Sequence, residues 1–320
     1  MALLKYMPQK FNFDFIGKRM IAFLVTAVIM VGSVAALAVN GLNFGIDFRG
    51  GLLLEVRTEG PANLAQMRQS LGGLGLGEVA LQGIGTNGDE VMIRVQRQEG
   101  GEEAQLAALQ QVRQALGDDV QIRRTEVVGP KVGAELVRDG TLAIALSILA
   151  IAAYVWFRFE WQFGVGALVA TFHDVIATFG FFALTGMEFN LTTVAAILTI
   201  AGYSINDTVV SYDRVRENLR KYKSMPLLDL LNLSANETLS RTLLTGVTTL
   251  LAVVALFFFG GDVLRGFSAA MIFGVVIGTF SSIYVAMPIL VYFNLRHSDS
   301  GEGEEEEESE KAKSEERAAG

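Results

Sequence analysis

The chain has 320 residues, of which 51% are hydrophobic and only 19% are charged; this composition is typical of a protein with several membrane spans and argues against a soluble domain. Cysteine is absent, which excludes disulfides, thiolate metal sites and cysteine nucleophiles. The formal net charge of −8 arises mainly from residues 298–320, where ten acids face three bases, a pattern typical of a solvated, disordered tail.

An apolar run from Ile21 to Val39 follows a short segment that ends in two basic residues. A spanning helix needs about 20 such residues. The alternative is a cleaved signal peptide, because the tripeptide at 36–38 resembles a cleavage site. The run is longer than the core of about 7–15 residues usual in such peptides, so we predict a retained transmembrane helix over 21–40.

A polar region over 41–140 is long enough for a small domain. Its pattern predicts a strand, a helix, two strands, a helix and a strand. Their expected ranges are 52–57, 63–71, 79–84, 90–95, 102–116 and 120–128. This βαββαβ order predicts a ferredoxin-like, two-layer α+β fold. The region has no histidine and its acids are scattered, so we expect a docking or substrate-contacting domain and not an enzyme.

Five more apolar segments, within the region 141–296, predict transmembrane helices. They are 141–157, 163–183, 190–211, 242–259 and 267–293. The connections at 158–162, 184–189 and 260–266 are short enough only for hairpins. The expected fold class is an α-helical polytopic membrane protein with six transmembrane helices and one α+β domain between the first and the second.

Positive charge predicts the orientation, because loops rich in Lys and Arg remain on the cytoplasmic side. The predicted loop 212–241 carries six basic residues, whereas the two hairpins on the opposite side hold only Arg265. We therefore expect the N-terminus (1–20), this loop and the acidic tail (297–320) in the cytoplasm, and the α+β domain on the outer side. Leucines after Pro226 predict a short helix along the membrane surface.

The segment from Asn190 to Asn218 is apolar enough to span a membrane at its start, yet it contains Asn206 and Asp207. At 100° per residue, its polar residues share one side with Asp207 and its apolar residues share the other. The polar side holds Thr192, Thr193, Thr199, Tyr203, Ser204 and Ser211, and the apolar side holds Leu191, Val194, Leu198, Ile205 and Val209. We infer that the apolar face meets lipid and that the polar face meets protein or water.

A carboxylate in hydrocarbon costs about 2.5–3.5 kcal/mol even on lenient insertion scales. Asp207 is either bonded to a neighbouring helix or part of a proton or ion site. We favour the second interpretation, with Asn206, Tyr203, Ser204 and Thr199 as polar support from the same helix.

His173 and Asp174 are adjacent in the middle of the third predicted span. Neighbouring residues on a helix point about 100° apart, and no ligand type lies four residues on, so the pair is a poor metal site. The alternatives are a buried polar pair that bonds to neighbouring helices and a second proton-linked carboxyl at Asp174, with His173 as polar support.

Arg241 lies four residues after Glu237. One interpretation is an exposed ion pair between them, which contributes only about 0.2–0.5 kcal/mol. The other is that Arg241 reaches toward Asp207. The sequence leaves both open.

Three glycine-containing motifs predict turns or close packing. Gly274 and Gly278 form a GxxxG pattern, which permits close helix contact, and Gly164, Gly166 and Ala167 could do the same. The motif GIDFRGG, with Gly45, Asp47, Arg49, Gly50 and Gly51, suits a tight turn from the membrane into a strand. No GK[ST] follows it, which argues against a phosphate-binding loop. The motif VVGPKVGAEL ends a strand at Gly129 and Pro130 and leads into a helix.

Together these motifs resemble the SecF family of bacterial protein translocase subunits. The resemblance is carried by GIDFRGG, VVGPKVGAEL, FHDV, GYSINDTVVSYDRVREN, ETLSRT and FFFGGDVLRGFS, and it covers residues 1 to 296. It implies a proton-driven membrane protein of the resistance-nodulation-division type in the cell inner membrane, with the α+β domain in the periplasm. It assigns proton use to the Asp of NDT and the Arg of SRT, which are Asp207 and Arg241 here.

The resemblance also implies partners. They are a SecD-like subunit, the SecYEG channel with SecA, a YidC-type insertase, an auxiliary YajC-type subunit, unfolded preprotein on the outer face, protons and membrane lipid, with no nucleic acid, no metal and no cofactor. Two alternatives stay open: half of a proton-driven solute exporter, and a structural scaffold in which Asp207 only packs.

Overall fold

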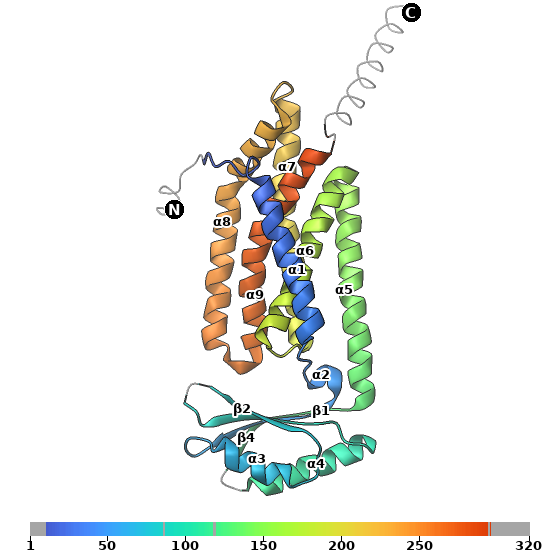
Figure 1. Ribbon diagram of the computed structural model, residues 1–320, viewed down its shortest axis with the longest axis vertical. Helices are drawn as coiled ribbons and strands as arrows, with labels where there is room; N and C mark the ends of the chain where they lie inside the picture. Colours follow the sequence, from blue (N-terminus) through green and yellow to red (C-terminus); the bar gives the residue numbers. More distant parts are fainter. Residues whose placement is uncertain (1–10, 86, 118–119, 294, 296–320) are drawn as a thin grey trace, which may run out of the picture.

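A computed structural model describes residues 11–85, 87–117, 120–293 and 295. The acidic tail predicted over 297–320 lies outside the described residues. Figure 1 shows a bundle of long helices with a small sheet domain at one end. Within the described part of the chain, six helices are long and apolar enough to cross a membrane, as the sequence predicted. They are α1 (Arg19–Asn40), α5 (Pro130–Arg158), α6 (Trp161–Thr185), α7 (Leu191–Lys221), α8 (Leu227–Phe259) and a last span that begins with α9 (Gly261–Ser281).

Local sequence signals explain where α6 and α7 end and begin. Gly186 adopts φ 65°, the left-handed conformation that ends many helices. Asn190 then caps α7: its side chain accepts a hydrogen bond from the Thr193 backbone, and Thr193 bonds back to the Asn190 backbone. The predicted hairpin at 184–189 is therefore a tight turn.

Helix α5, which contains the second predicted span, starts at Pro130, directly after strand β4. The helix predicted after Gly129 and Pro130 and the span predicted from residue 141 are therefore one continuous helix. Hydropathy missed the first part of this helix because it contains Glu135, Arg138 and Asp139, which are charged but compatible with a helix.

The prediction of a loop over 212–241 is wrong. Helix α7 continues to Lys221 and α8 begins at Leu227, so little of this segment is non-helical. The predicted surface helix after Pro226 is the start of α8, where Leu230 and Leu231 are fully buried in the same core cluster as Ile16. The predicted spans were too short because polar residues were treated as their ends. Arg, Lys, Glu and Leu are all good helix formers, so the helices continue through them.

The last span is not one regular helix. A π-helical turn (Ser282–Ala286) follows α9, then α10 (Met287–Ile289) and a 3-10 turn (Leu290–Tyr292). Pro288 accounts for the break, because it has no N–H and its ring clashes with a carbonyl one turn earlier. The span predicted over 267–293 is therefore present, but it is interrupted where the sequence predicted a continuous helix.

The domain between α1 and α5 has the predicted βαββαβ order. It consists of β1 (Gly51–Thr58), α3 (Leu64–Gly72), β2 (Val79–Ile84), β3 (Glu90–Val95), α4 (Gly101–Leu116) and β4 (Val120–Val128). The strands lie in the order β2-β3-β1-β4, and each neighbouring pair is antiparallel. This order agrees with the split βαβ arrangement that the sequence predicted.

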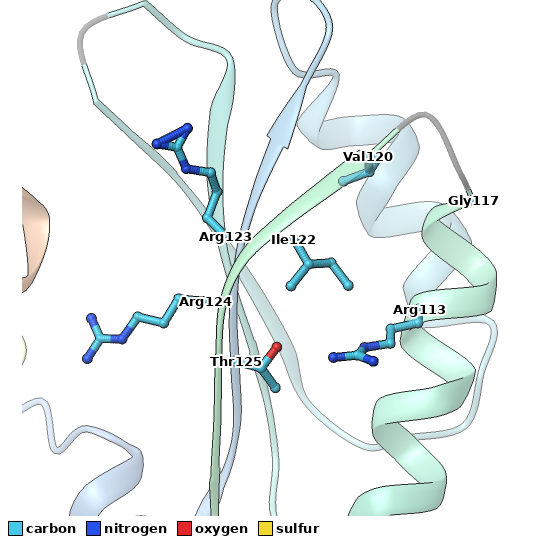
Figure 2. A pocket seen from close by; sticks show the side chains of 7 residues that line it. All are labelled: Arg113, Gly117, Val120, Ile122, Arg123, Arg124 and Thr125. Atoms are coloured by element: carbon cyan, nitrogen blue, oxygen red, sulfur yellow. The ribbon is translucent and has the colours of Figure 1, made fainter.

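Helices α3 and α4 cover one face of this sheet, and the other face points toward the bundle (Figure 1). Alternate residues of the central strands, such as Leu54 and Ile93, are fully buried against the helices. A bulge in β4 leaves Arg123 without a partner residue on β1. As Figure 2 shows, Ile122 and Thr125 point toward α4, whereas Arg123 and Arg124 point away from it.

Candidate functional site

Asp174, in the middle of α6, is fully buried and fully bonded. Its Oδ2 accepts hydrogen bonds from the hydroxyls of Ser204 on α7 (2.5 Å) and Ser281 on α9 (2.7 Å). Its Oδ1 lies 3.0 Å from His173 Nδ1. One carboxyl therefore joins three helices, as the interpretation of a buried polar pair predicted.

His173 is also buried, and its ring lies beside Phe280 with centroids 6.3 Å apart. Its Nε2 is buried and has no hydrogen-bond partner among the described residues. No cluster of three or more metal-ligand residues occurs within the described ranges. The two side chains contact each other, although their positions differ by about 100° around the helix.

Asp207, on α7, is only 2% exposed, but its surroundings differ. Its Oδ1 lies 3.4 Å from the Thr245 hydroxyl of α8, and its Oδ2 is buried without a partner among the described residues. The Thr245 hydroxyl also lies within 3.1 Å of the Arg241 and Thr242 carbonyls. One hydroxyl proton cannot serve three acceptors, so Asp207 is poorly satisfied.

Arg241 lies on α8, one helical turn before Thr245, and it is exposed. The described residues include no ion pair of Arg241 with Glu237: instead, Glu237 accepts a 2.8 Å hydrogen bond from Asn218 and lies 3.7 Å from Arg214. No direct ion pair between Arg241 and Asp207 occurs in the described ranges either. Neither of the two contacts expected for Arg241, with Glu237 or with Asp207, is therefore formed within the described residues.

The polar residues predicted around Asp207 fall into three groups. Ser204 bonds to Asp174 and not to Asp207. Tyr203 is half-buried, and its hydroxyl is buried without a bond partner within the described part of the chain. Thr199 and Asn206 are exposed, and the Thr199 hydroxyl donates to the Ala195 carbonyl of its own helix.

The prediction of one lipid-facing side on α7 is wrong at Val194, which is buried. Helix α7 packs against α5, α6, α8 and α9, so neighbours cover part of its apolar side, whereas Thr199 on its polar side is exposed. The division of such a helix into a polar and an apolar side does not identify the side that faces lipid.

The sequence missed the residues of neighbouring helices that meet these carboxyls or lie close by: Thr245, Ser281 and Ser282. Ser282 opens the π-helical turn and lies 3.0 Å from the Thr208 hydroxyl of α7. The predicted GxxxG contact explains how the helices come so close. A Cβ at Gly274 would collide with the Ile200 side chain, and one at Gly278 would lie 3.2 Å from Ser204.

The motif GIDFRGG joins the sheet domain to the bundle. It forms a short helix, α2 (Ile46–Arg49), where the sequence predicted only a turn. Asp47 Oδ2 accepts a 2.8 Å hydrogen bond from the Leu191 N–H at the start of α7, and the Gly45 N–H donates to the Phe189 carbonyl at 2.9 Å. Gly50 and Gly51 then turn into β1 with φ 72° and 133°, which favour glycine.

An ion pair spans the same junction. Arg94 of β3 lies 3.0 Å from Glu188 in the turn between α6 and α7, and both are mostly buried. Burial raises the pKa of the Glu188 carboxyl, and the charge of Arg94 opposes this shift. Beside the pair, a cleft of about 740 Å³ separates the sheet face from the turns of the bundle, and Arg124, Glu55 and Glu126 also line it.

Where the chain leaves the same domain, Gly129 caps α5 and Pro130 is the first residue of this helix, as VVGPKVGAEL predicted. Gly133 on α5 faces the Phe48 and Asp47 carbonyls so closely that a Cβ there would lie 3.1 Å from the first. The two glycine motifs therefore pack against each other.

Comparison with known proteins decides the family. The family model described as protein export membrane protein SecD/SecF, C-terminal, matches residues 108–296, and the SecD/SecF GG motif matches residues 35–62. The chain belongs to the SecD/SecF family. The residues matched by the GG motif include Gly50 and Gly51, which turn the chain into β1.

Relatives of similar length carry the name protein translocase subunit SecF. One from Rickettsia bellii (strain OSU 85-389) is 44% identical over 294 residues, which cover 91% of this chain and 96% of the relative. One from Cereibacter sphaeroides is 46% identical over 300 residues, covering 91% and 93%. Membership of the SecD/SecF family supports a role in protein translocation.

Solved structures of SecDF share the fold. The crystal structure of SecDF from Thermus thermophilus, a translocon-associated membrane protein, is 34% identical, with a TM-score of 0.80 over 91% of this chain. SecDF in the super-membrane-facing form gives a TM-score of 0.65 over 92% of this chain at the same identity. This chain spans 40% of each SecDF chain.

Proposed function

We propose that this chain is a SecF-type subunit that works with a SecD-type partner beside the SecYEG channel and couples proton movement at Asp207 to the later, post-SecA stages of protein export. Family membership supports the role in export, and the partner is suggested by the length of SecDF, of which this chain spans 40%. The relay consists of Asp207, Arg241 and, in a second position, Asp174.

The observation that carries the proposal is the poorly satisfied carboxyl of Asp207. An ionised carboxylate with a buried, unpartnered oxygen is costly, so this group needs a proton or an incoming donor. The weak contact with Thr245 leaves Oδ2 free for either. Asp174 has no free oxygen, which makes it the less active member of the relay.

Arg241 supplies the alternating donor. Its guanidinium favours the ionised form of Asp207 when it is near and allows proton uptake when it is distant. One proton that moves through about 100 mV releases roughly 2.3 kcal/mol, which is enough to bias two packings of a helix bundle. A shift of α8 against α7 would pass this motion to the sheet domain through the junction at Glu188 and Asp47.

A SecD-type partner would cover the polar surface near this site. Thr199, Gly202 and Asn206 are spaced along α7 and are exposed in this chain alone, and Arg241 is exposed on the neighbouring helix. An exposed amide or guanidinium in hydrocarbon is unfavourable. A second subunit that buries this surface would remove the penalty and complete the relay.

The end of the bundle away from the sheet domain holds the basic residues of α7, so we assign it to the cytoplasmic side of the inner membrane, with both termini. The sheet domain then meets unfolded preprotein in the periplasm, and its charged cleft is the surface that we assign to this contact. The YidC-type and YajC-type partners rest on the family resemblance alone.

Asp207→Asn tests the proposal, because the amide keeps the size of the carboxyl and removes the titrating proton. We expect the variant to assemble with SecD but to lose the part of preprotein export into inverted membrane vesicles that a protonophore abolishes. Asp229→Asn, a change of an exposed acid at the start of α8, is the matched control and should export normally. Protonophore-sensitive export by Asp207→Asn at the control rate would support the scaffold alternative and overturn the proposal.

Arg241 gives a second test with graded outcomes. Arg241→Lys keeps the charge but loses the planar guanidinium, so partial export is expected, whereas Arg241→Met should behave like Asp207→Asn. The matched control is Lys223→Met, which removes an exposed cation between α7 and α8, outside both the relay and the groove described below. If Arg241→Met supports full proton-dependent export, the switch lies elsewhere.

A further inference from the structure

A groove of about 630 Å³ lies at the end of the bundle opposite the sheet domain, where α5 ends and α7 extends beyond it (Figure 1). It is lined by Arg158, Asp213, Arg216, Glu217, Arg220 and Lys221. Four cations thus face two acids. The proposed proton relay uses none of these residues.

The two acids are already paired. Asp213 accepts a 2.8 Å hydrogen bond from Arg158, and Glu217 accepts a 2.9 Å hydrogen bond from Arg214. Arg216 and Arg220 have no acidic partner among the described residues. The groove therefore carries excess positive charge, and a ligand that fits it is an anion.

The guanidinium of Arg216 is held in place before any ligand arrives. Its Nη1 donates to the Arg158 carbonyl at 3.4 Å, and its Cζ lies 5.6 Å from the centre of the buried Phe159 ring. The Arg158 guanidinium lies 4.9 Å from the same ring. Two guanidinium groups on one ring make a positioned pair, and such planar groups bind phosphate oxygens bidentately.

The position of the groove suggests where the anion comes from. Arg158 directly follows the apolar segment 141–157, so it lies where the second span leaves the hydrocarbon. Trp156 is 68% exposed, Phe157 is 91% exposed and Trp161 is 54% exposed around it. Exposed aromatic side chains at the end of a span are typical of the membrane–water interface.

We propose that this groove binds the phosphate of an anionic phospholipid headgroup, with Arg216 and Arg220 as the main contacts and the acyl chains beside the exposed aromatic side chains. Basic pockets between the ends of transmembrane helices are suited to such headgroups. A zwitterionic headgroup carries a positive charge of its own, so it should bind the groove less tightly than an anionic headgroup. The site goes beyond the proposed function and does not depend on it.

Native mass spectrometry of the delipidated full chain tests the site with phosphatidylglycerol and phosphatidylcholine. We expect phosphatidylglycerol to be retained more tightly, by about fivefold for each arginine that meets the phosphate. Arg216→Gln/Arg220→Gln should lose this preference, and Arg216→Lys/Arg220→Lys should keep part of it. Arg113→Gln/Arg123→Gln, which removes two arginines from a hollow in the sheet domain (Figure 2), is the matched charge control and should keep it fully. Equal retention of both lipids by the native chain would overturn the proposal.

A measurement in bilayers guards against a misfolded variant. Trp156 and Trp161 are the two tryptophans of the chain, and both lie at this end of the bundle. Brominated phosphatidylglycerol should quench their fluorescence more than brominated phosphatidylcholine at equal mole fraction, and Arg216→Gln/Arg220→Gln should remove the difference. Inorganic phosphate added at constant ionic strength should not remove this difference in quenching. If it removes the difference, the groove binds free phosphate and the assignment to lipid is wrong.

Discussion

Asp174 and Asp207 lie on adjacent helices of the same bundle, and both are buried, but only one of them is satisfied. Asp174 accepts two serine hydroxyls and contacts a histidine, so α6, α7 and α9 meet at its carboxyl. Asp207 has one weak contact with a threonine and an oxygen without a partner within the described residues. The first surroundings hold helices together, and the second leave a group that a proton or a cation can approach.

The difference shows that burial alone does not identify a functional carboxyl. A buried acid whose oxygens all have donors is part of the packing, and its removal leaves those donors unpaired. A buried acid with a free oxygen costs stability, and a cost of this kind is often retained because the group has a function. The predictions that follow test this distinction on stability, which is independent of export.

Asp174→Ala should give the largest effect. It leaves Ser204, Ser281 and His173 without their shared acceptor, and hydrogen bonds to charged groups contribute about 1.5–3 kcal/mol each. We expect a loss of about 3 kcal/mol or more in the free energy of unfolding, measured by thermal or denaturant unfolding in detergent. Asp174→Asn, which keeps an acceptor oxygen, should lose less. If the unfolding midpoint of Asp174→Ala equals that of the native chain, the carboxyl of Asp174 does not hold the helices together, and the distinction from Asp207 is wrong.

Gly274→Ala should come next, because the new Cβ would collide with Ile200 where α9 meets α7. Overpacking of this kind costs about 1–3 kcal/mol. Gly202→Ala is the matched control, since nothing lies within 4 Å of a Cβ at that exposed position of α7. Equal unfolding midpoints for the two variants would show that close contact at Gly274 does not position Ser204 and Ser281 around Asp174.

Asp207→Asn should change stability by less than about 1 kcal/mol, and we expect the sign to be stabilising. The amide removes a charge that has little compensation, whereas it loses only the 3.4 Å contact with Thr245. The same unfolding assay as for Asp174→Ala measures it. A loss as large as that of Asp174→Ala would mean that both carboxyls are structural.

Glu188 should give the smallest effect, and one that depends on pH. Burial raises its pKa above the ordinary value of 4.5 despite the nearby Arg94. The folded protein therefore binds this proton more readily than the unfolded chain, so the contribution is fully present below the unfolded pKa and is lost as pH rises through the folded pKa. The stability of the native chain minus that of Glu188→Gln should therefore fall as the pH rises above the ordinary pKa of 4.5. A difference between the native chain and Glu188→Gln that does not change with pH would contradict the raised pKa of Glu188.

Much of the fold follows from local pattern. The length of the apolar segments predicted six spans, and the spacing of apolar residues predicted the order of strands and helices in the sheet domain. Both signals are local, because they depend only on which residues of one helix or strand are apolar. The predicted ends of the spans were wrong where charged helix formers continue a helix, as after Ser211. Asp207 was identified from the cost of its charge in hydrocarbon, with no knowledge of its neighbours.

The tertiary structure decided which residues meet each carboxyl. Ser204 lies three residues before Asp207 on α7, so the sequence pattern placed the two on one face, yet Ser204 bonds to Asp174 of the neighbouring helix. Gly274 and Gly278 let α9 approach α7 closely, which places Ser281 beside the same carboxyl. No pattern within α7 contains this information, because the partners come from two other helices.

Thr199 was expected near Asp207 for the same reason of helical spacing, and Asn206 was expected to support it as the preceding residue, but both are exposed. Helical spacing gives the direction of a side chain around its own axis, and this much the sequence determined for α7. It does not say which neighbour stands in that direction, because helix contacts depend on residues far apart in the chain. The positions of Asp207 and the packing glycines were therefore readable from the sequence, whereas the free oxygen of Asp207 and the serine bonds of Asp174 exist only where α6, α7, α8 and α9 pack together.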